Sequence, residues 1–121
     1  MIKALFVGLG GFIGVLLRYL IGILPMKSSF VFPIKTFLIN VVGCFIIGLI
    51  SALILKQTLN NENLEAFLKI GLCGGFTTFS TFAFESSELI KNSNVLIAVI
   101  YVLLSITLGI SAVAFAQYII K

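Results

Sequence analysis

The sequence has few charged residues and no histidine. Of its 121 residues, 10% are charged and 60% are hydrophobic, and the mean hydropathy is +1.25. A soluble domain of this length buries only part of its chain and could not hide so much apolar surface. The composition therefore indicates an integral membrane protein.

The residue patterns of common enzyme mechanisms are also missing. No nucleophile stands beside a base, and no cluster has the spacing of metal ligands. The glycine-rich segment 71–75 lacks the lysine that a phosphate-binding loop requires. We therefore expect that the protein is not an enzyme.

Cysteines and clustered charges are scarce as well. Cys44 and Cys73 both fall in apolar segments, so we expect two buried small hydrophobes and no disulfide framework. The net charge of +4 comes from lysines that are scattered singly. Nucleic-acid binding is therefore not expected.

What the sequence does contain is long apolar segments. A membrane-spanning helix needs about 20 apolar residues. We expect four spans, at about 4–26, 34–55, 66–85 and 95–120. They predict a single all-α transmembrane domain over residues 1–121, with both termini on one side. The first span contains Arg18 and lacks a clear cleavage pattern, so we expect it to be retained rather than removed as a signal peptide.

The third span contains an unusual run, residues 71–82. Three glycines and the sequence Thr-Thr-Phe-Ser-Thr-Phe occupy positions that leucine, isoleucine and valine fill in ordinary spans. Glycine costs about 1 kcal/mol relative to alanine in a helix, and serine and threonine compete for its hydrogen bonds. We expect the helix to break near Gly74 to Thr78. Irregular backbone survives in a bilayer only inside protein or beside a watery cavity, so the break predicts a site.

The cationic residues are divided equally between the two sides of the membrane. Four lie on the side of the termini and four on the other side: Lys3, Lys56, Lys69 and Lys121 against Arg18, Lys27, Lys35 and Lys91. Orientation normally follows an excess of positive charge on one side. Either a weak bias decides the topology, or both orientations are made and pair as an antiparallel homodimer.

Small residues follow one face of the first span. Gly10, Gly14, Arg18 and Gly22 are four residues apart, and such glycines usually form a packing seam between helices. Arg18 is costly inside a bilayer, so it faces protein, a watery vestibule or, by snorkelling, the interface. A structural pair between Arg18 and Glu85 is a further alternative.

The other spans carry polar side chains in comparable stripes. Asn40 follows Thr36 by one turn and, because a buried amide needs partners, either joins two helices or contacts a passing ligand. Tyr101 and Ser105 begin a similar stripe in the fourth span.

Three phenylalanines of the third span project in similar directions where the helix persists. Phe76, Phe79 and Phe82 are three residues apart, which is most often a core pattern. The alternative is a path for a small anion, because the edge of an aromatic ring is electropositive. Arg18 and Asn40 could add donors to such a path, and no acidic residue is expected deep in any span.

These residues resemble the small fluoride channels of the Fluc or CrcB family over essentially the whole chain. The resemblance is carried by Gly10-Gly11-x-x-Gly14-x-x-x-Arg18-Tyr19, by Thr36-x-x-x-Asn40-x-x-Gly43-x-Phe45-x-x-Gly48, and most specifically by Gly71-x-x-Gly74-Gly75-Phe76-Thr77-Thr78-Phe79-Ser80-Thr81-Phe82-x-x-Glu85. Tyr101-x-x-x-Ser105 matches more weakly, and Gly109 stands where some relatives have a hydroxyl.

The resemblance implies a passive fluoride-selective channel of the plasma (inner) membrane that relieves fluoride toxicity. It implies a dual-topology homodimer with two antiparallel pores and a structural sodium ion held at the dimer centre by the backbone carbonyls of Gly74 and Thr77. It assigns the pore to Asn40, Phe79, Phe82, Ser80, Thr81, Tyr101 and Ser105, and the vestibule to Arg18 and Thr36.

Two other functions are compatible with four spans. A small multidrug or cation exporter also has balanced charges, but it needs a membrane-embedded carboxylate, which the sequence is not expected to provide. A non-transporting helical subunit of a membrane complex would explain the glycine seams but not the Phe-Ser-Thr-Phe run.

Overall fold

The computed structural model describes residues 1–26 and 31–121. Lys27, one of the cations counted on the far side, lies outside the described residues. Throughout these residues all regular structure is helical, and four helices are long and apolar enough to cross a bilayer. They are α1 (Ile2–Gly22), α2 (Ile34–Leu55), a third span over Glu62–Lys91 and α6 (Val95–Ile120).

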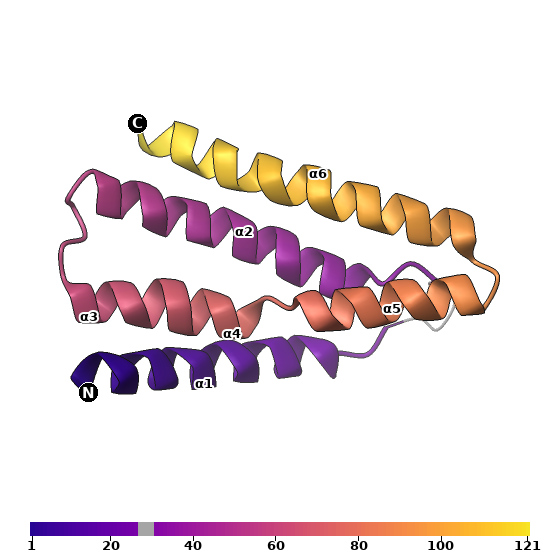
Figure 1. Cartoon of the computed structure of the whole chain (residues 1–121), viewed down its shortest axis with the longest axis horizontal. Helices are drawn as coiled ribbons and strands as arrows, with labels where there is room; N and C mark the ends of the chain where they lie inside the picture. The colour runs from indigo at the N-terminus through magenta and orange to yellow at the C-terminus, as the bar shows by residue number, and fades with distance from the viewer. Residues whose placement is uncertain (27–30) are drawn as a thin grey trace.

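The four spans lie side by side, and both termini are at the same end (Figure 1). Across the bundle, from one side to the other, the order is α1, the third span, α2 and α6 (Figure 1). The closest packing joins α2 to α6 and joins α1 to the first half of the third span. The chain is therefore a multi-pass helical membrane protein.

The third span is built from four helical pieces. These are α3 (Glu62–Glu65), the π-helix η1 (Ala66–Cys73), α4 (Gly74–Phe76) and α5 (Phe79–Lys91). Asn61 caps the start, since its side chain accepts hydrogen bonds from the N–H groups of Asn63 and Leu64. The sequence pattern did not predict the π-helix, a rare form that is common at functional sites.

The break in this span redirects it from one neighbour to another. The first half, η1 and α4, packs on α1, whereas α5 packs on α6. The interruption lies at Thr77 and Thr78, which are extended, with φ/ψ of −84°/159° and −150°/119°. Gly74, where the expected interval began, is still helical. The threonines therefore break the helix and the glycines serve another purpose.

That purpose is close contact with α1. A Cβ at Gly75 would lie 2.7 Å from the Gly11 carbonyl oxygen, and one at Gly14 would overlap the carbonyl of Leu72. Gly10 and Gly14 are both buried at this contact. The predicted seam exists at these two positions but does not continue to Gly22, where an added Cβ would meet no heavy atom within 4 Å.

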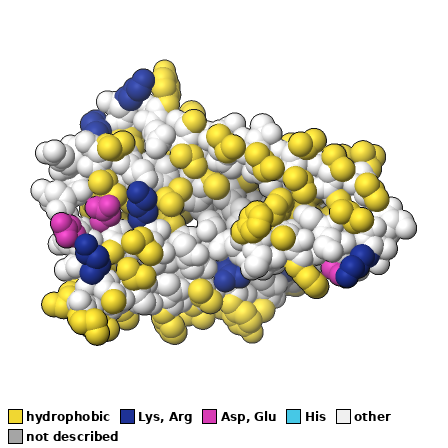
Figure 2. Space-filling view, in the orientation of Figure 1, with side chains coloured by type: hydrophobic (Ala, Val, Ile, Leu, Met, Phe, Trp, Pro, Cys, Tyr) yellow, Lys and Arg dark blue, Asp and Glu magenta, His cyan; other side chains and the backbone are white. Residues whose placement is uncertain are grey.

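The exposed surface is mainly apolar, as expected for a chain surrounded by lipid. In the space-filling view, yellow apolar side chains cover much of the face, and the charged side chains gather mainly at its two ends (Figure 2). The end with both termini carries an ion pair between Lys3 and Glu62, and the other end carries one between Lys91 and Glu88.

Two identical substitutions in α1 test the seam. Gly14→Ala should lower the thermal unfolding midpoint in detergent, because overpacking against backbone costs about 1–3 kcal/mol. Gly8→Ala is the matched control, since its Cβ would meet nothing within 4 Å and alanine is the better helix former. Equal midpoints for the two variants would contradict the close contact.

Candidate functional site

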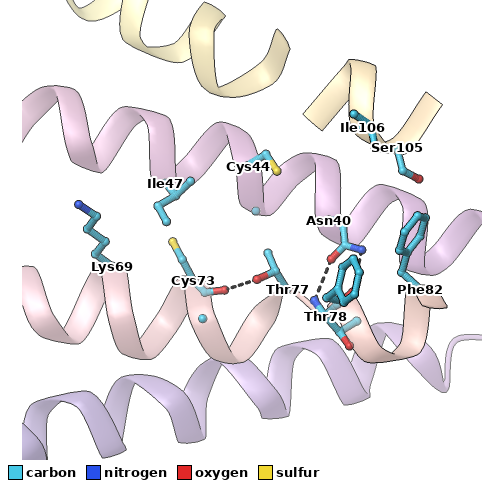
Figure 3. Close-up of a pocket in the computed structure, with 13 residues that line it drawn as sticks. Asn40, Cys44, Ile47, Lys69, Cys73, Thr77, Thr78, Phe82, Ser105 and Ile106 are labelled. Carbon is cyan, nitrogen blue, oxygen red and sulfur yellow. Dashed lines mark hydrogen bonds between the residues drawn. The ribbon is translucent and has the colours of Figure 1, made fainter. Parts of the chain in front are cut away.

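The extended residues Thr77 and Thr78 leave backbone groups that the helix cannot satisfy. Asn40 of α2 binds both polar groups of Thr78: its Nδ2 donates to the Thr78 carbonyl (3.0 Å), and its Oδ1 accepts from the Thr78 N–H (2.8 Å). Figure 3 shows the second of these bonds beside the break. Asn40 therefore replaces the helical hydrogen bonds that the break removes.

The break also removes the regular helical donors of the carbonyls of Gly74, Gly75 and Thr77. In an unbroken helix the N–H of Thr78 would bond to Gly74, and that of Thr81 to Thr77. The first donates to Asn40 and the second to the side-chain oxygen of Thr78 (3.2 Å). The carbonyl of Gly75 instead accepts from Arg18 Nε (3.2 Å). Among the described residues, the carbonyls of Gly74 and Thr77 thus lose their regular donors.

A cavity of about 380 Å³ lies between the break, α2 and α6 (Figure 3). Six of the residues predicted from the sequence are part of its lining: Asn40, Gly74, Thr77, Phe79, Phe82 and Ser105. Most of the remaining lining is apolar, with two free thiols, Cys44 and Cys73. The cavity brings an amide, three hydroxyl groups and two aromatic rings together.

The aromatic and hydroxyl groups at one end of this cavity form a connected set. The ring centroids of Phe79 and Phe82 are 5.8 Å apart, and Phe82 meets Tyr101 edge to face at 5.0 Å. Ser105 lies close to Phe82 in the close-up (Figure 3). Its Oγ is the one buried side-chain polar atom in the described part of the chain that has no hydrogen-bond partner. Such an atom needs a hydrogen-bond partner, which a water or a bound ion can supply.

A second cavity, of about 540 Å³, lies on the other side of the break. Arg18, Thr36 and Thr81 contribute to its lining, together with Glu85. Glu85 accepts hydrogen bonds from Thr36 Oγ1 (3.0 Å) and from the hydroxyl of Tyr101 (2.9 Å). The Arg18–Glu85 pair considered above is absent, because Arg18 binds a carbonyl and two hydroxyls satisfy the carboxylate.

The remaining predicted pore residues lie apart from the first cavity. Tyr101 has no exposed surface and packs in the core with Leu89 and Ala98, so that only its hydroxyl approaches the second cavity through Glu85. Ser80 is exposed and lines neither cavity.

Sequence reasoning missed two charged residues of the site. Glu85 was expected at the end of the third span, but the span continues to Lys91, so Glu85 lies inside it and is partly buried. Lys69 was expected near the start of the third span and was not assigned to the site, but it lines the first cavity. The helix continues to Glu62 and to Lys91, so both residues lie inside it. A charge that interrupts an apolar segment was the available signal in both cases.

The fold and these cavities define a small multi-pass helical membrane protein with polar sites at the break of one span. Comparison with known proteins makes the class specific. A family profile described as "CrcB-like protein, Camphor Resistance (CrcB)" matches residues 5–117. The chain belongs to this family.

Several relatives cover almost the whole chain. A protein of Azobacteroides pseudotrichonymphae is 42% identical over 93% of this chain and 92% of its own length. One of Ruminiclostridium cellulolyticum is 38% identical over 100% and 94%, and one of Clostridium perfringens is 35% identical over 97% and 92%. Each is named "Fluoride-specific ion channel FluC", which is the name of a channel and not of an enzyme.

The bridge from Asn40 to the break can be tested by truncation. Asn40→Ala should lower the thermal unfolding midpoint in detergent, because each buried backbone group left unpaired costs about 1–3 kcal/mol. Asn40→Asp should have an intermediate effect, since it keeps the acceptor for the Thr78 N–H. Ser80→Ala, at an exposed position on the same span, is the control and should leave the unfolding midpoint unchanged. If Asn40→Ala melts like Ser80→Ala, Asn40 does not support the break.

Proposed function

We propose that the protein is a passive, fluoride-selective ion channel that lets cytoplasmic fluoride leave the cell and so relieves its toxicity. The observation that carries the proposal is the 35–42% identity, over most of the chain, to proteins named fluoride-specific ion channels. The cavity beside the break supports it, since it combines neutral hydrogen-bond donors with aromatic rings.

In this proposal the donors replace the water that surrounds a fluoride ion. The Nδ2 of Asn40 has two hydrogens, of which one bonds to Thr78 and the other remains for an anion. The electropositive ring edges of Phe79 and Phe82 add attraction without a fixed charge. The buried hydroxyl of Ser105 supplies a further donor, and the ion offsets the cost of its missing partner.

The second cavity is proposed as the aqueous vestibule. Arg18 and Thr36 line it and provide a positive charge and a hydroxyl at its surface. Thr81 also lines it, and we propose that the polar track continues from Thr81 past Ser80 and Tyr101. Two of these hydroxyls, those of Thr36 and Tyr101, already donate to Glu85, which holds them in place.

We also propose that two copies assemble as an antiparallel, dual-topology homodimer with two pores. The equal division of cations favours neither orientation. The face around the break is also exposed and free to pack against a second copy. Phe79 is 78% exposed, and a Cβ at Gly74 would meet nothing within 4 Å. A second copy placed there would complete the lining of each pore.

A structural sodium ion at the dimer centre fits the backbone of the break. The carbonyls of Gly74 and Thr77 have lost their regular donors, and a carbonyl oxygen is a suitable ligand for a hard monovalent cation. Two such carbonyls from each copy would hold the ion, whose positive charge would offset the partial negative charge of the four oxygens and join the two broken spans.

The physiology follows from acid–base chemistry. Fluoride enters from acidic surroundings as neutral HF and ionises in the neutral cytoplasm, where it is trapped. A passive path in the plasma membrane lets the anion leave down its electrochemical gradient. No chemical reaction or energy source is required, and this agrees with the absence of histidine from the sequence.

Efflux from fluoride-loaded liposomes tests the function. With sodium present, a fluoride electrode should record release well above that from protein-free vesicles. Phe79→Ile and Phe82→Ile should each reduce the rate roughly 2- to 10-fold, because the ring-edge interaction is worth about 0.5–1.5 kcal/mol. Asn40→Asp should also reduce it, since a carboxylate repels the anion.

The matched control is Phe12→Ile, at an exposed position of α1 that lines none of the cavities described. Its efflux should equal that of the unmodified protein. Wild-type efflux no faster than leakage from empty vesicles would overturn the channel proposal, and unchanged flux in either cavity variant would remove that ring from the path. Replacing sodium by N-methylglucamine should slow efflux if the proposed ion is required.

Labelling from one side of the membrane tests the dual topology. In a background of Cys44→Ala and Cys73→Ala, Gln57→Cys and Asn92→Cys place single thiols in loops at opposite ends of the bundle. An impermeant maleimide applied to intact cells should label about half of each variant, because equal charge leaves both orientations populated. Complete labelling of one variant and none of the other would contradict the antiparallel dimer.

A proton-coupled exporter is the second candidate, because Glu85 is a partly buried carboxylate within a span. Its two hydroxyl partners favour a structural role, since Thr36 and Tyr101 both donate to the carboxylate and hold it in place. Uptake of an aromatic cation driven by a pH gradient in the same vesicles would support the exporter over the channel.

A further inference from the structure

Lys69 is a charged side chain in an otherwise neutral cavity. Among the described residues that line the cavity beside the break, it is the one with a charge. It lies at the end opposite Ser105 and Phe82, and its side chain extends from η1 toward α2 (Figure 3). Within the described part of the chain it forms no hydrogen bond or ion pair.

Lys69 also faces a more polar environment at the end of the bundle that carries both termini. A neighbouring cavity of about 380 Å³ is lined by Lys69 together with Lys3, Glu62 and Glu65. Lys3 is paired with Glu62 at 3.2 Å, so these two charges largely cancel. The two remaining charges in this cavity are those of Lys69 and of Glu65, four residues before it. Lys69 therefore stands where the outer, charged cavity meets the inner, neutral one.

We propose that Lys69 captures anions at this end of the pathway and that Glu65 moderates its attraction. The inference rests on the proposed channel function, because it assigns the entry of the ion to a residue of the same cavity. An unpaired ammonium at the mouth of a low-dielectric cavity concentrates anions and raises their rate of entry. Glu65 has the opposite charge and lowers that local concentration.

The alternative is that Lys69 is structural. Its aliphatic stem would cover apolar surface while the ammonium reaches water, as lysines near the ends of spans often do. The two explanations differ in one measurable property. Capture of an anion by a fixed charge depends on ionic strength, with a Debye length of about 30 Å at 0.01 M and about 3 Å at 1 M. Coverage of apolar surface does not depend on ionic strength in this way.

The experiment measures initial fluoride efflux from liposomes against fluoride concentration. Sodium is kept constant, and N-methylglucamine isethionate sets the ionic strength at about 0.01 M or about 1 M. At low ionic strength and low fluoride, Lys69→Gln should slow efflux roughly 3- to 10-fold, because it removes the positive charge that attracts the anion. Glu65→Gln should accelerate efflux, because it removes the negative charge that repels the anion. Both differences should shrink below about twofold at 1 M salt or at saturating fluoride.

Two further variants separate charge from shape. Lys69→Arg keeps the charge and should retain wild-type efflux at low salt. Lys91→Gln removes the same charge at the other end of the third span, next to Glu88, and should leave efflux unchanged. Equal efflux for Lys69→Gln and wild type at low salt, or a deficit that is the same at both ionic strengths, would overturn the capture role. Absence of efflux in the wild type would overturn the proposed channel function itself.

Discussion

The structure depends on the way one broken span satisfies its backbone inside a bilayer. Hydrocarbon offers no hydrogen bonds, so each N–H and C=O that leaves the helix must find a partner in the protein. Asn40 gives Thr78 both partners, and Thr78 caps the helix that follows. The first cavity lies at the place where this exchange of partners occurs. Asn40 and Thr78, which satisfy the backbone at the break, therefore also line the cavity.

The glycines of α1 and of the third span make this arrangement possible. Gly14 and Gly75 bring the two backbones close together, which leaves the Gly75 carbonyl within reach of Arg18. Dense packing on one side of the break contrasts with the exposed Gly74 on the other side. The first half of the span is thus closely packed on α1, and the face around the break is exposed. A second copy can cover this exposed face, as the proposed dimer requires.

Beyond the break, α5 turns away from α1 and joins the aromatic core around Tyr101. The tyrosine hydroxyl and Thr36 both donate to Glu85, so the carboxylate is held without a cation. This arrangement ties α2, α5 and α6 together next to the proposed vestibule. It also leaves Arg18 at the proposed vestibule instead of in an ion pair, because its Nε binds a carbonyl that carries no net charge.

The sequence by itself determined the class, the four spans and the presence of a break, because bilayer thickness and the cost of glycine and threonine in helices act locally. It also indicated Asn40, Phe79, Phe82 and Ser105, which the structure brings to one cavity. Only the tertiary structure decided that the break falls at the threonines, that Asn40 binds Thr78, and that Glu85 takes hydroxyl partners instead of Arg18. It also placed Lys69 inside a cavity. These choices depend on how each helix is rotated and how closely it packs, and contacts between residues far apart in the chain set both.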